Sequence, residues 1–466
     1  MNAEDAEERK GRRVRLELSR DLGASHATAI VVGTVIGSGI FLVPAEMMQA
    51  VGSAKLVYLA WIVGGLLSLF GALTYAELGA VRPESGGEYA YLRDAYGPLW
   101  GFLYAWTFFL LAKPASIATV TAGVVRILSS FPALSILQRS VISFITYGHL
   151  LAIIITIFIS WLNYIGIRRA GEFQRVFTIL KVGMVLLIVA AAFSYTNGNW
   201  VNFGTTFSGA KGGVAGFMAA LVAALWAYDG WNDLTQVGGE VRNPQRSIPI
   251  GLIAGMVSVA ALYISVNAAV QYAMPAAAIA DSAYPASQAV ALALGSAGAA
   301  LVSAAMALSM IVTMNGTVMS GARVPFAMAR DGYFFHAMAE VHPRFHTPST
   351  AIIVQATMAI ALTLFAGTFQ QLFSLAIYAE WLFYMLAAST VFVFRKREQD
   401  GPRPYSTWGY PVVPLFFILA SAVLLYYTFT ENLRNSVVGT LIILAGIPVF
   451  YWFGSRSAAS RDRSGS

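Results

Sequence analysis

The chain has 466 residues, of which 57% are hydrophobic and only 11% are charged, and its mean hydropathy is +0.65. Soluble domains carry about a quarter charged residues, so this composition excludes an ordinary soluble protein and predicts one integral membrane domain. The net charge is +7, and there is no cysteine, which excludes disulfides, thiolate metal sites and cysteine catalysis.

The two ends of the chain differ from the rest in composition. Residues 1–23 are rich in charged side chains of both signs and contain no apolar core. We therefore expect a cytoplasmic N-terminal tail there and not a cleavable signal peptide. A second, shorter cytoplasmic tail is expected at 456–466.

Between the tails, at 24–455, windows close to the ~20 apolar residues that span a bilayer recur along the whole chain. They predict an all-α membrane domain with twelve spans. The predicted spans are 24–50, 55–80, 98–128, 141–164, 174–196, 213–240, 248–274, 289–322, 349–366, 370–394, 411–430 and 436–455.

The basic residues orient these spans. With a cytoplasmic N-terminus, 23 of the 30 lysines and arginines fall in cytoplasmic segments, five fall outside and two lie within spans. This asymmetry follows the positive-inside rule and predicts a multi-pass protein of the cell (inner) membrane with both termini cytoplasmic. The basic residues are spread over many loops, so the charge predicts no nucleic-acid partner.

The first predicted span contains the segment Gly33-Thr-Val-Ile-Gly-Ser-Gly-Ile-Phe41. Glycine inside a helix costs ~1 kcal/mol relative to alanine, so Gly37-Ser38-Gly39 predicts a break. Broken backbone at membrane depth is tolerated only where it faces protein or a water-filled cavity. The half-helix after the break would offer free N–H groups and a positive dipole end, which suit a carboxylate. Gly33 by itself is explained by close helix packing.

Lys181 lies inside the fifth predicted span, roughly 12 Å along a helix from Phe173. Ionisable side chains at membrane depth are costly and suggest function, although a lysine that snorkels to the interface is the alternative. Its three donors need acceptors.

The sixth predicted span is interrupted by Asp229-Gly230, within Trp226-Ala-Tyr-Asp-Gly-Trp-Asn232. The two breaks lie five spans apart, as expected for two repeats of opposite topology at about 24–196 and 213–394. The helices at 411–455 would be additional to these repeats. Paired broken helices at the bilayer midplane point to the substrate site of a secondary transporter.

Asp229 and Glu380 are the two carboxylates of most interest. A carboxylate that faces a substrate pocket could pair with a cationic substrate side chain, or it could bind a proton. Asp229 could instead form an ion pair within the protein or cap the second half of the sixth span. Glu380 could occupy a wet position outside the pocket.

Enzymatic signals are absent from the sequence. The five histidines have no spacing suited to a metal, and no serine–histidine–carboxylate arrangement stands out. There is also no phosphate-binding loop of the G-x-x-x-x-G-K-[S/T] type. The sequence therefore predicts no enzyme, no catalytic residues, no metal and no other cofactor.

The segment Gly33–Phe41 resembles the first-span signature of the amino acid–polyamine–organocation superfamily. Further segments narrow the resemblance to the L-type amino acid transporters, which include the light subunits of heteromeric transporters and their bacterial homologues. These segments are Ala76-Glu-Leu-Gly79, Ser85-Gly-Gly-Glu-Tyr-Ala-Tyr91, Lys113-Pro-Ala-Ser116, Trp226 to Asn232 and Met314-Asn-Gly-Thr317. The resemblance implies the five-plus-five inverted-repeat fold (the LeuT or APC fold) with discontinuous helices 1 and 6, and sodium-independent amino acid exchange.

The resemblance also implies a substrate site. The N–H groups of Gly37, Ser38 and Gly39, with the Ser38 hydroxyl, would bind the substrate carboxylate. The carbonyls of Val35, Trp226 and Ala227 would accept the α-ammonium. These positions would suit a zwitterion, because one half-helix end is positive and the other is negative.

Other residues take their roles from the same resemblance. Trp226 matches an aromatic residue that closes over the substrate, and Lys181 matches a lysine that occupies the sodium site of sodium-coupled relatives. An ammonium there would bridge spans 1, 5 and 8, so its candidate acceptors are carbonyls near the first break, or hydroxyls such as those of Ser309 and Thr313 in the eighth span. Members that accept dibasic substrates share the Tyr-Asp-Gly-Trp string around Asp229. Glu380, beside Trp381, departs from the common pattern, in which a neutral amide is frequent. We assign Trp226, Asp229, Glu380 and Trp381 to the substrate side chain or to the gate.

The expected partners are L-amino acids and membrane lipid, with no disulfide-linked heavy chain because cysteine is absent. Neutral amino acids are the expected substrates, and cationic ones are possible. Exchange by alternating access is the main hypothesis for coupling, and proton-coupled symport is the alternative.

Overall fold

The structure, a computed structural model, describes residues 16–143, 145–365, 369–399, 401–431 and 433–464. The first fifteen residues of the predicted N-terminal tail therefore lie outside the described residues. At the other end, the region expected to be a tail continues as helix, because α19 extends over Leu433–Ser464.

The predicted break in the first span is confirmed. Helix α2 (Ala24–Val35) ends before Ile36, and helix α3 (Gly39–Val51) begins three residues later. The two helices are bent by 43° and together pass as one membrane span. Ser38 is the N-cap residue of α3, so the first free N–H groups of that helix lie at the break.

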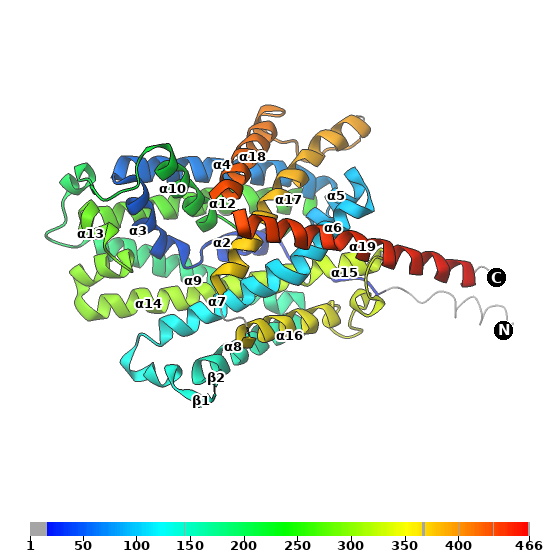
Figure 1. Cartoon of the computed structure of the whole chain (residues 1–466), viewed down its shortest axis with the longest axis horizontal. Coiled ribbons are helices and arrows are strands. Elements are labelled where there is room, and N and C mark those ends of the chain that lie inside the picture. Colours follow the sequence, from blue (N-terminus) through cyan, green and yellow to red (C-terminus); the bar gives the residue numbers. More distant parts are fainter. Residues whose placement is uncertain (1–15, 144, 366–368, 400, 432, 465–466) are drawn as a thin grey trace.

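The remaining secondary structure is mostly helical (Figure 1). In the first half, the helices are α4 (Ala54–Val81), α5 (Glu88–Tyr96), α6 (Pro98–Thr107), the π-helix η1 (Phe108–Ala112), α7 (Lys113–Leu128), η2 (Pro132–Gln138), α8 (Tyr147–Tyr164), α9 (Ile167–Phe193) and η3 (Trp200–Gly204). In the second half, they are α10 (Gly213–Ala227), α11 (Asp233–Gln236), η4 (Gly238–Glu240), α12 (Pro244–Ala273), α13 (Ala276–Ala280), α14 (Pro285–Gly321), α15 (Arg323–Arg330), η5 (His336–Ala339), α16 (Ser349–Phe365), α17 (Phe369–Arg397) and α18 (Val412–Glu431).

Two predicted boundaries were wrong. The predicted fourth span began at residue 141, but strands β1 (Ser140–Ile142) and β2 (Ile145–Thr146) form a short antiparallel hairpin there. Helix α8 begins only at Tyr147, where the Thr146 hydroxyl accepts a hydrogen bond from the His149 N–H. Helix α9 begins at Ile167, seven residues before the predicted position 174. The prediction missed this start because charged residues lie in the first turns of the helix.

In the part of the chain that the structure describes, eight helices are long and apolar enough to cross a membrane, and the α2–α3 pair makes a ninth. Helices α10 and α16 are apolar but shorter. The all-α membrane fold is therefore confirmed, while the full count of twelve spans remains a prediction.

The second break is also present. Helix α10 ends at Ala227, and α11 starts at Asp233. Gly230 lies between them with a φ of 100°, a conformation that favours glycine, and a Cβ there would lie 3.0 Å from Thr34. A Cβ on Gly39 would lie 3.2 Å from the Ala227 side chain. The two breaks therefore adjoin each other inside the bundle.

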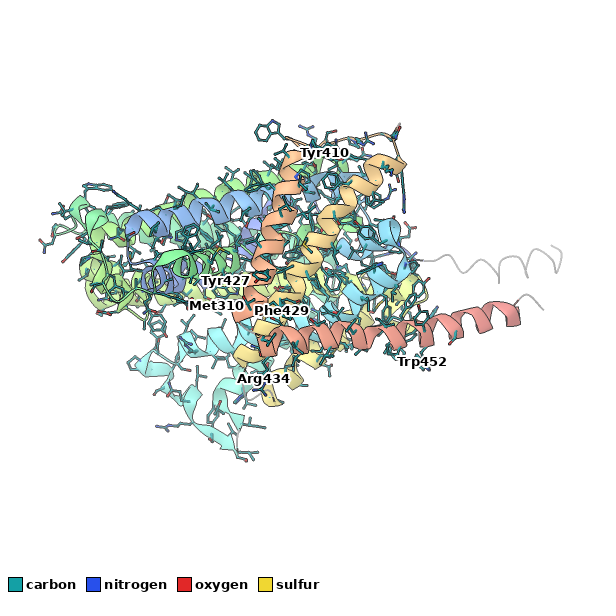
Figure 2. The ribbon with its side chains drawn as sticks, turned by 45° about the horizontal axis from the view of Figure 1, so that its top comes forward. Met310, Tyr410, Tyr427, Phe429, Arg434 and Trp452 are labelled. Carbon is teal, nitrogen blue, oxygen red and sulfur yellow. The ribbon has the colours of Figure 1, made fainter. Side chains whose placement is uncertain are left out.

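The short elements lie at the two ends of the bundle. Helices α5 and α15 lie towards the same end as the C-terminus of α19, and α13 lies towards the opposite end (Figure 1). Helix α19 runs along the outside of the bundle, with Arg434 near its start and Trp452 nearer its C-terminal end (Figure 2). The first break, between α2 and α3, lies between these ends (Figure 1).

A buried ion pair joins two segments near the α5–α15 end. The Arg323 guanidinium donates to both carboxylate oxygens of Glu240, over 2.7 and 2.9 Å, and both side chains are fully buried. It also donates to the carbonyl of Met319 over 2.8 Å. The start of α15 is thus held to η4, which follows the second half of the broken sixth span.

We expect Arg323→Met to destabilise the protein by ~3–5 kcal/mol, because it leaves the Glu240 charge buried without a partner. The double variant Arg323→Met with Glu240→Leu should recover much of this loss, since both charges are removed. Thermal unfolding of the purified variants in detergent measures the effect. Equal unfolding temperatures for wild type and Arg323→Met would contradict the prediction.

Candidate substrate site between the two broken helices

A cavity of about 120 Å³ lies between the two breaks. Four further helices complete it: α7, α14, α17 and the π-helix η1. The lining residues are Thr34, Val35, Gly37, Ser38, Gly39, Ala112, Lys113, Ser116, Thr119, Val120, Trp226, Ala227, Asp229, Gly230, Asn232, Asp233, Met310, Thr313, Thr317, Glu380 and Tyr384. Most of the residues predicted for the site therefore lie around one cavity.

The side of the cavity formed by the first break offers backbone donors. Gly37, Ser38 and Gly39 all line it, at the N-terminal end of α3. Helix N-termini carry free N–H groups and a partial positive charge, which is the environment that a carboxylate prefers. The geometry is compatible with the predicted carboxylate site.

Carbonyl groups from both breaks converge on one tyrosine. The Tyr263 hydroxyl of α12 lies 3.0 Å from the carbonyl oxygen of Val35 and 2.7 Å from that of Ala227. A hydroxyl has a single proton to donate, so one of these carbonyls keeps its lone pairs free. That carbonyl could accept an ammonium. Tyr263 was missed by the sequence analysis, since nothing distinguishes it from other aromatic residues of an apolar span.

Lys181 is 1% exposed and lies against the first break. Its ammonium donates to the carbonyl oxygens of Gly33, at 2.7 Å, and Ile36, at 2.6 Å. The hydroxyl of Ser309 in α14 donates to the same Ile36 carbonyl over 2.7 Å, and Thr313 lies 3.2 Å from the carbonyls of both Gly33 and Ile36. Lys181 thus connects α9 to carbonyls of the broken α2 segment, where α14 also binds, and it does not snorkel.

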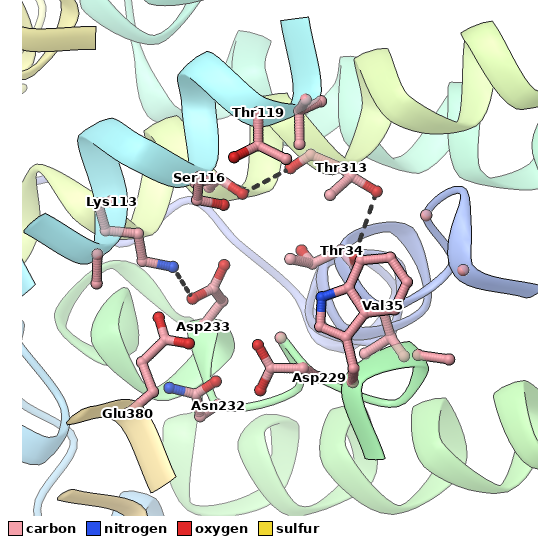
Figure 3. Close-up of a pocket in the computed structure, with 18 of the residues that line it drawn as sticks. Thr34, Val35, Lys113, Ser116, Thr119, Asp229, Asn232, Asp233, Thr313 and Glu380 are labelled. Carbon is pink, nitrogen blue, oxygen red and sulfur yellow. Dashed lines mark hydrogen bonds and ion pairs between the residues drawn. The ribbon is translucent and has the colours of Figure 1, made fainter. Parts of the chain in front are cut away.

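The opposite side of the cavity is charged (Figure 3). The Lys113 ammonium forms an ion pair of 2.5 Å with Asp233, and both side chains are at least nine-tenths buried. Lys113 follows directly on the π-helix η1, a deviation that often marks a functional site. The pair links α7 to the first residue of α11, across the second break.

The two predicted carboxylates both face this charged side. Asp229 lines the cavity and accepts a hydrogen bond of 3.0 Å from the Tyr384 hydroxyl. Glu380 also lines it, so the alternative of a wet position outside the pocket is wrong. In Figure 3 the carboxylates of Asp229, Asp233 and Glu380 point towards the same part of the cavity.

The position of Trp381 differs from the prediction. Its indole does not line this cavity but a separate apolar one between α4, α10 and α18. It packs against Tyr384, with ring centroids 5.7 Å apart, and against Phe417, at 6.2 Å. Neighbouring residues of a helix point about 100° apart, and here Glu380 faces the cavity while Trp381 faces α18. Trp381 is better described as a packing residue.

Behind the charged side lies one more buried acid, Glu88 of α5. Its carboxylate accepts hydrogen bonds from Asn232, at 2.6 Å, and from the Tyr104 hydroxyl, at 3.1 Å. The Tyr384 hydroxyl, which has a single proton to donate, lies 3.1 Å from the side-chain oxygen of Asn232 as well as 3.0 Å from Asp229. Glu88 is therefore connected to Asp229 through two intervening side chains, although it does not line the cavity.

The sequence contained a signal for Lys113 and Asp233 that the analysis did not use. Both are ionisable residues inside predicted spans, and such residues pair with each other or bind substrate. Asp233 also lies four residues after Asp229. The missing information was that α7 and α11 are neighbours, which the sequence conceals because Lys113 and Asp233 lie 120 positions apart.

Comparisons with known proteins show the family of the chain. The sequence profile of the amino acid permease family matches residues 22–454. The chain is 33% identical to the serine/threonine exchanger SteT of Bacillus subtilis, over 95% of this chain and 98% of the relative. It is 31% identical to the human b(0,+)-type amino acid transporter 1, over 94% and 88%. It is 30% identical to the human cystine/glutamate transporter, over 94% and 86%.

Glu88 makes the stability of the protein depend on pH. Burial raises the pKa of this carboxylate to about 7, in spite of the hydrogen bonds from Asn232 and Tyr104, which lower it. Between its ordinary pKa of 4.5 and about 7, the folded protein keeps a proton that the unfolded chain has lost, so stability falls as the pH rises. We expect Glu88→Gln to reduce this pH dependence. Unfolding temperatures between pH 5 and pH 8, measured in detergent, test it, and identical slopes for the two proteins would contradict it.

Proposed function

Because this chain belongs to the amino acid permease family, we propose that it is a sodium-independent exchanger of L-amino acids that accepts neutral and cationic substrates. The observation that carries the proposal is the cavity between the two broken helices, which offers N–H donors at the start of α3, carbonyls at the ends of α2 and α10, and carboxylates on its charged side. An amino acid zwitterion is a dipole that fits between such ends. Alternating access of this cavity would carry the substrate across the membrane.

Within this proposal, the half-helix end at Gly37, Ser38 and Gly39 binds the carboxylate of the substrate. The carbonyls of Val35, Trp226 and Ala227 receive its ammonium group. The substrate side chain then points towards Asp229 and Glu380. The opposed polarity of the two sides would fix the orientation of the substrate before its side chain is selected.

The independence from sodium follows from Lys181. A sodium ion bound at the first break would need the carbonyl oxygens that the Lys181 ammonium already occupies. The fixed ammonium would perform the structural work of a bound cation without being transported. Because Lys181 is only 1% exposed, an ion from solution would not replace its ammonium.

We further propose that the protein lies in the cell (inner) membrane with both termini in the cytoplasm, as the distribution of basic residues predicts. It would act as a transporter and not as an enzyme. It would also act without a heavy chain attached by a disulfide, since the 466 residues contain no cysteine. Transport by the purified chain alone is therefore expected.

The first test concerns sodium. Purified protein in liposomes should exchange amino acids at equal rates in sodium and choline buffers. Lys181→Ala should lower the turnover at least tenfold, because the carbonyls of the break lose their donors. The exposed Lys55→Ala, in the first turn of α4, is the matched control and should behave as wild type. A large stimulation of wild-type exchange by sodium would refute the role of Lys181.

The second test concerns cationic substrates. A partly desolvated ion pair with Asp229 can contribute ~1–3 kcal/mol, or up to about a hundredfold in affinity. Asp229→Asn keeps the shape of the side chain and removes its charge, so arginine and ornithine exchange should collapse while leucine exchange changes only a few-fold. Glu380→Gln should have the smaller effect on this ratio. If Asp229→Asn lowers the exchange of all substrates equally, Asp229 is a structural cap.

A further inference from the structure

The charges that line the cavity do not balance. Three carboxylates, Asp229, Asp233 and Glu380, face one ammonium, that of Lys113. Lys113 pairs with Asp233 at 2.5 Å, which leaves two carboxylates with no basic partner in the described part of the cavity wall. Isolated charges at membrane depth are costly, so the cavity must obtain positive charge from elsewhere.

The other polar groups packed around Glu380 do not supply this charge. Tyr384 and Asn232 are neutral, and Tyr384 donates its hydroxyl proton towards Asp229 and Asn232. Glu88 behind Asn232 is another acid, hydrogen-bonded by Tyr104. The Lys181 ammonium lies on the far side of the first break, where it is bound to backbone carbonyls and does not line the cavity.

The side chain of the substrate changes the net charge in the cavity by one unit. The guanidinium or ammonium side chain of a cationic amino acid brings one positive charge to Asp229 and Glu380, whereas a neutral amino acid brings none. The cavity would therefore need one more proton with a neutral substrate than with a cationic one. Asp229 and Glu380 would share this additional proton, because interacting acids titrate as a pair.

We propose that this protein moves one proton together with the neutral amino acid whenever it exchanges a neutral substrate for a cationic one, and that the Asp229–Glu380 pair carries this proton. This inference rests on the proposed exchange function and adds its ionic coupling. The proton leaves water on the side where the neutral substrate enters, forms an O–H bond with a carboxylate oxygen, and returns to water on the other side. One positive charge then crosses in each direction, so the exchange is electroneutral.

The contacts favour Glu380 as the member of the pair that holds the proton. Asp229 accepts the Tyr384 hydroxyl at 3.0 Å, and Asp233 is already paired with Lys113, so both are stabilised as anions. Glu380 has no ion-pair partner among the described residues, and it faces the space that the substrate side chain would enter. A cationic substrate would therefore displace the proton of Glu380.

The experiment uses liposomes that contain the full chain, arginine and a pH-sensitive dye. External leucine should acidify the interior by one proton for each leucine taken up. Exchange of arginine for arginine, or of leucine for leucine, should move no net proton. A membrane potential imposed with potassium and valinomycin should leave the rate of leucine–arginine exchange unchanged, because no net charge crosses.

Glu380→Gln should abolish the proton signal and make leucine–arginine exchange respond to the membrane potential, while leucine–leucine exchange continues. Glu88→Gln is the matched control, since it alters a buried acid that does not line the cavity, and its proton signal should persist. Loss of the signal in Glu88→Gln with its retention in Glu380→Gln would overturn the assignment of the proton to the Asp229–Glu380 pair.

The measurement on the wild-type protein alone also tests the proposed proton coupling. Leucine–arginine exchange that moves no proton and responds to the potential would overturn the proposal, even if Glu380→Gln failed to fold. Exchange restricted to neutral amino acids would overturn it as well, while leaving the broader function intact. Failure to exchange any amino acid would instead refute the proposed function itself, so the two failures are distinguishable.

Discussion

The site depends on one constraint: backbone groups at membrane depth must find partners inside the protein. Breaking α2 from α3 frees the carbonyls of Gly33 and Ile36, and these are bound by the Lys181 ammonium. Hydroxyls of α14 bind the same region. These donors keep the break open, and an open break leaves the N–H groups of the following half-helix facing the cavity. The lysine does not line the cavity, yet its bond to the Ile36 carbonyl, in the peptide group that also carries the Gly37 N–H, holds the geometry that would bind the substrate carboxylate.

The second break is stabilised differently, and this difference explains where selectivity can arise. Asp233 begins α11 and is anchored by Lys113 across the cavity, whereas Asp229, inside the break, accepts a hydrogen bond from a hydroxyl of α17 and has no basic partner in the described part of the cavity wall. One acid is therefore neutralised by the protein and the other remains available. Substrate selection can then be tuned at Asp229 and Glu380 without loss of the pair that fixes the helix.

The sequence was sufficient for the features that depend on local chemistry. Both breaks could be predicted, because glycine within an apolar span is costly unless the helix ends there. Lys181 could be identified as a candidate functional residue because a charged side chain inside a membrane span is costly. Features that depend on which helices are neighbours could not be predicted: the Lys113–Asp233 pair joins distant segments, and the Tyr263 hydroxyl reaches both breaks from α12. The prediction for Trp381 was wrong for a related reason, since Trp381 packs against Phe417 of the neighbouring α18, and the sequence does not show that these two helices are in contact.

Hydrogen bonds also connect the charged side of the cavity to one end of the bundle. Asp229 is connected to Glu88 through Tyr384 and Asn232, and Glu88 belongs to α5, near the end of the bundle where α15 and the C-terminus of α19 lie. A change of charge at Asp229 alters the direction in which the single Tyr384 proton is donated, and hence how Asn232 is held. Because Asn232 directly precedes α11, the charge state of the substrate site bears on the position of the second half-helix. In the proposed mechanism, the groups that would recognise the substrate charge therefore contact the half-helix that would move when the cavity changes its access.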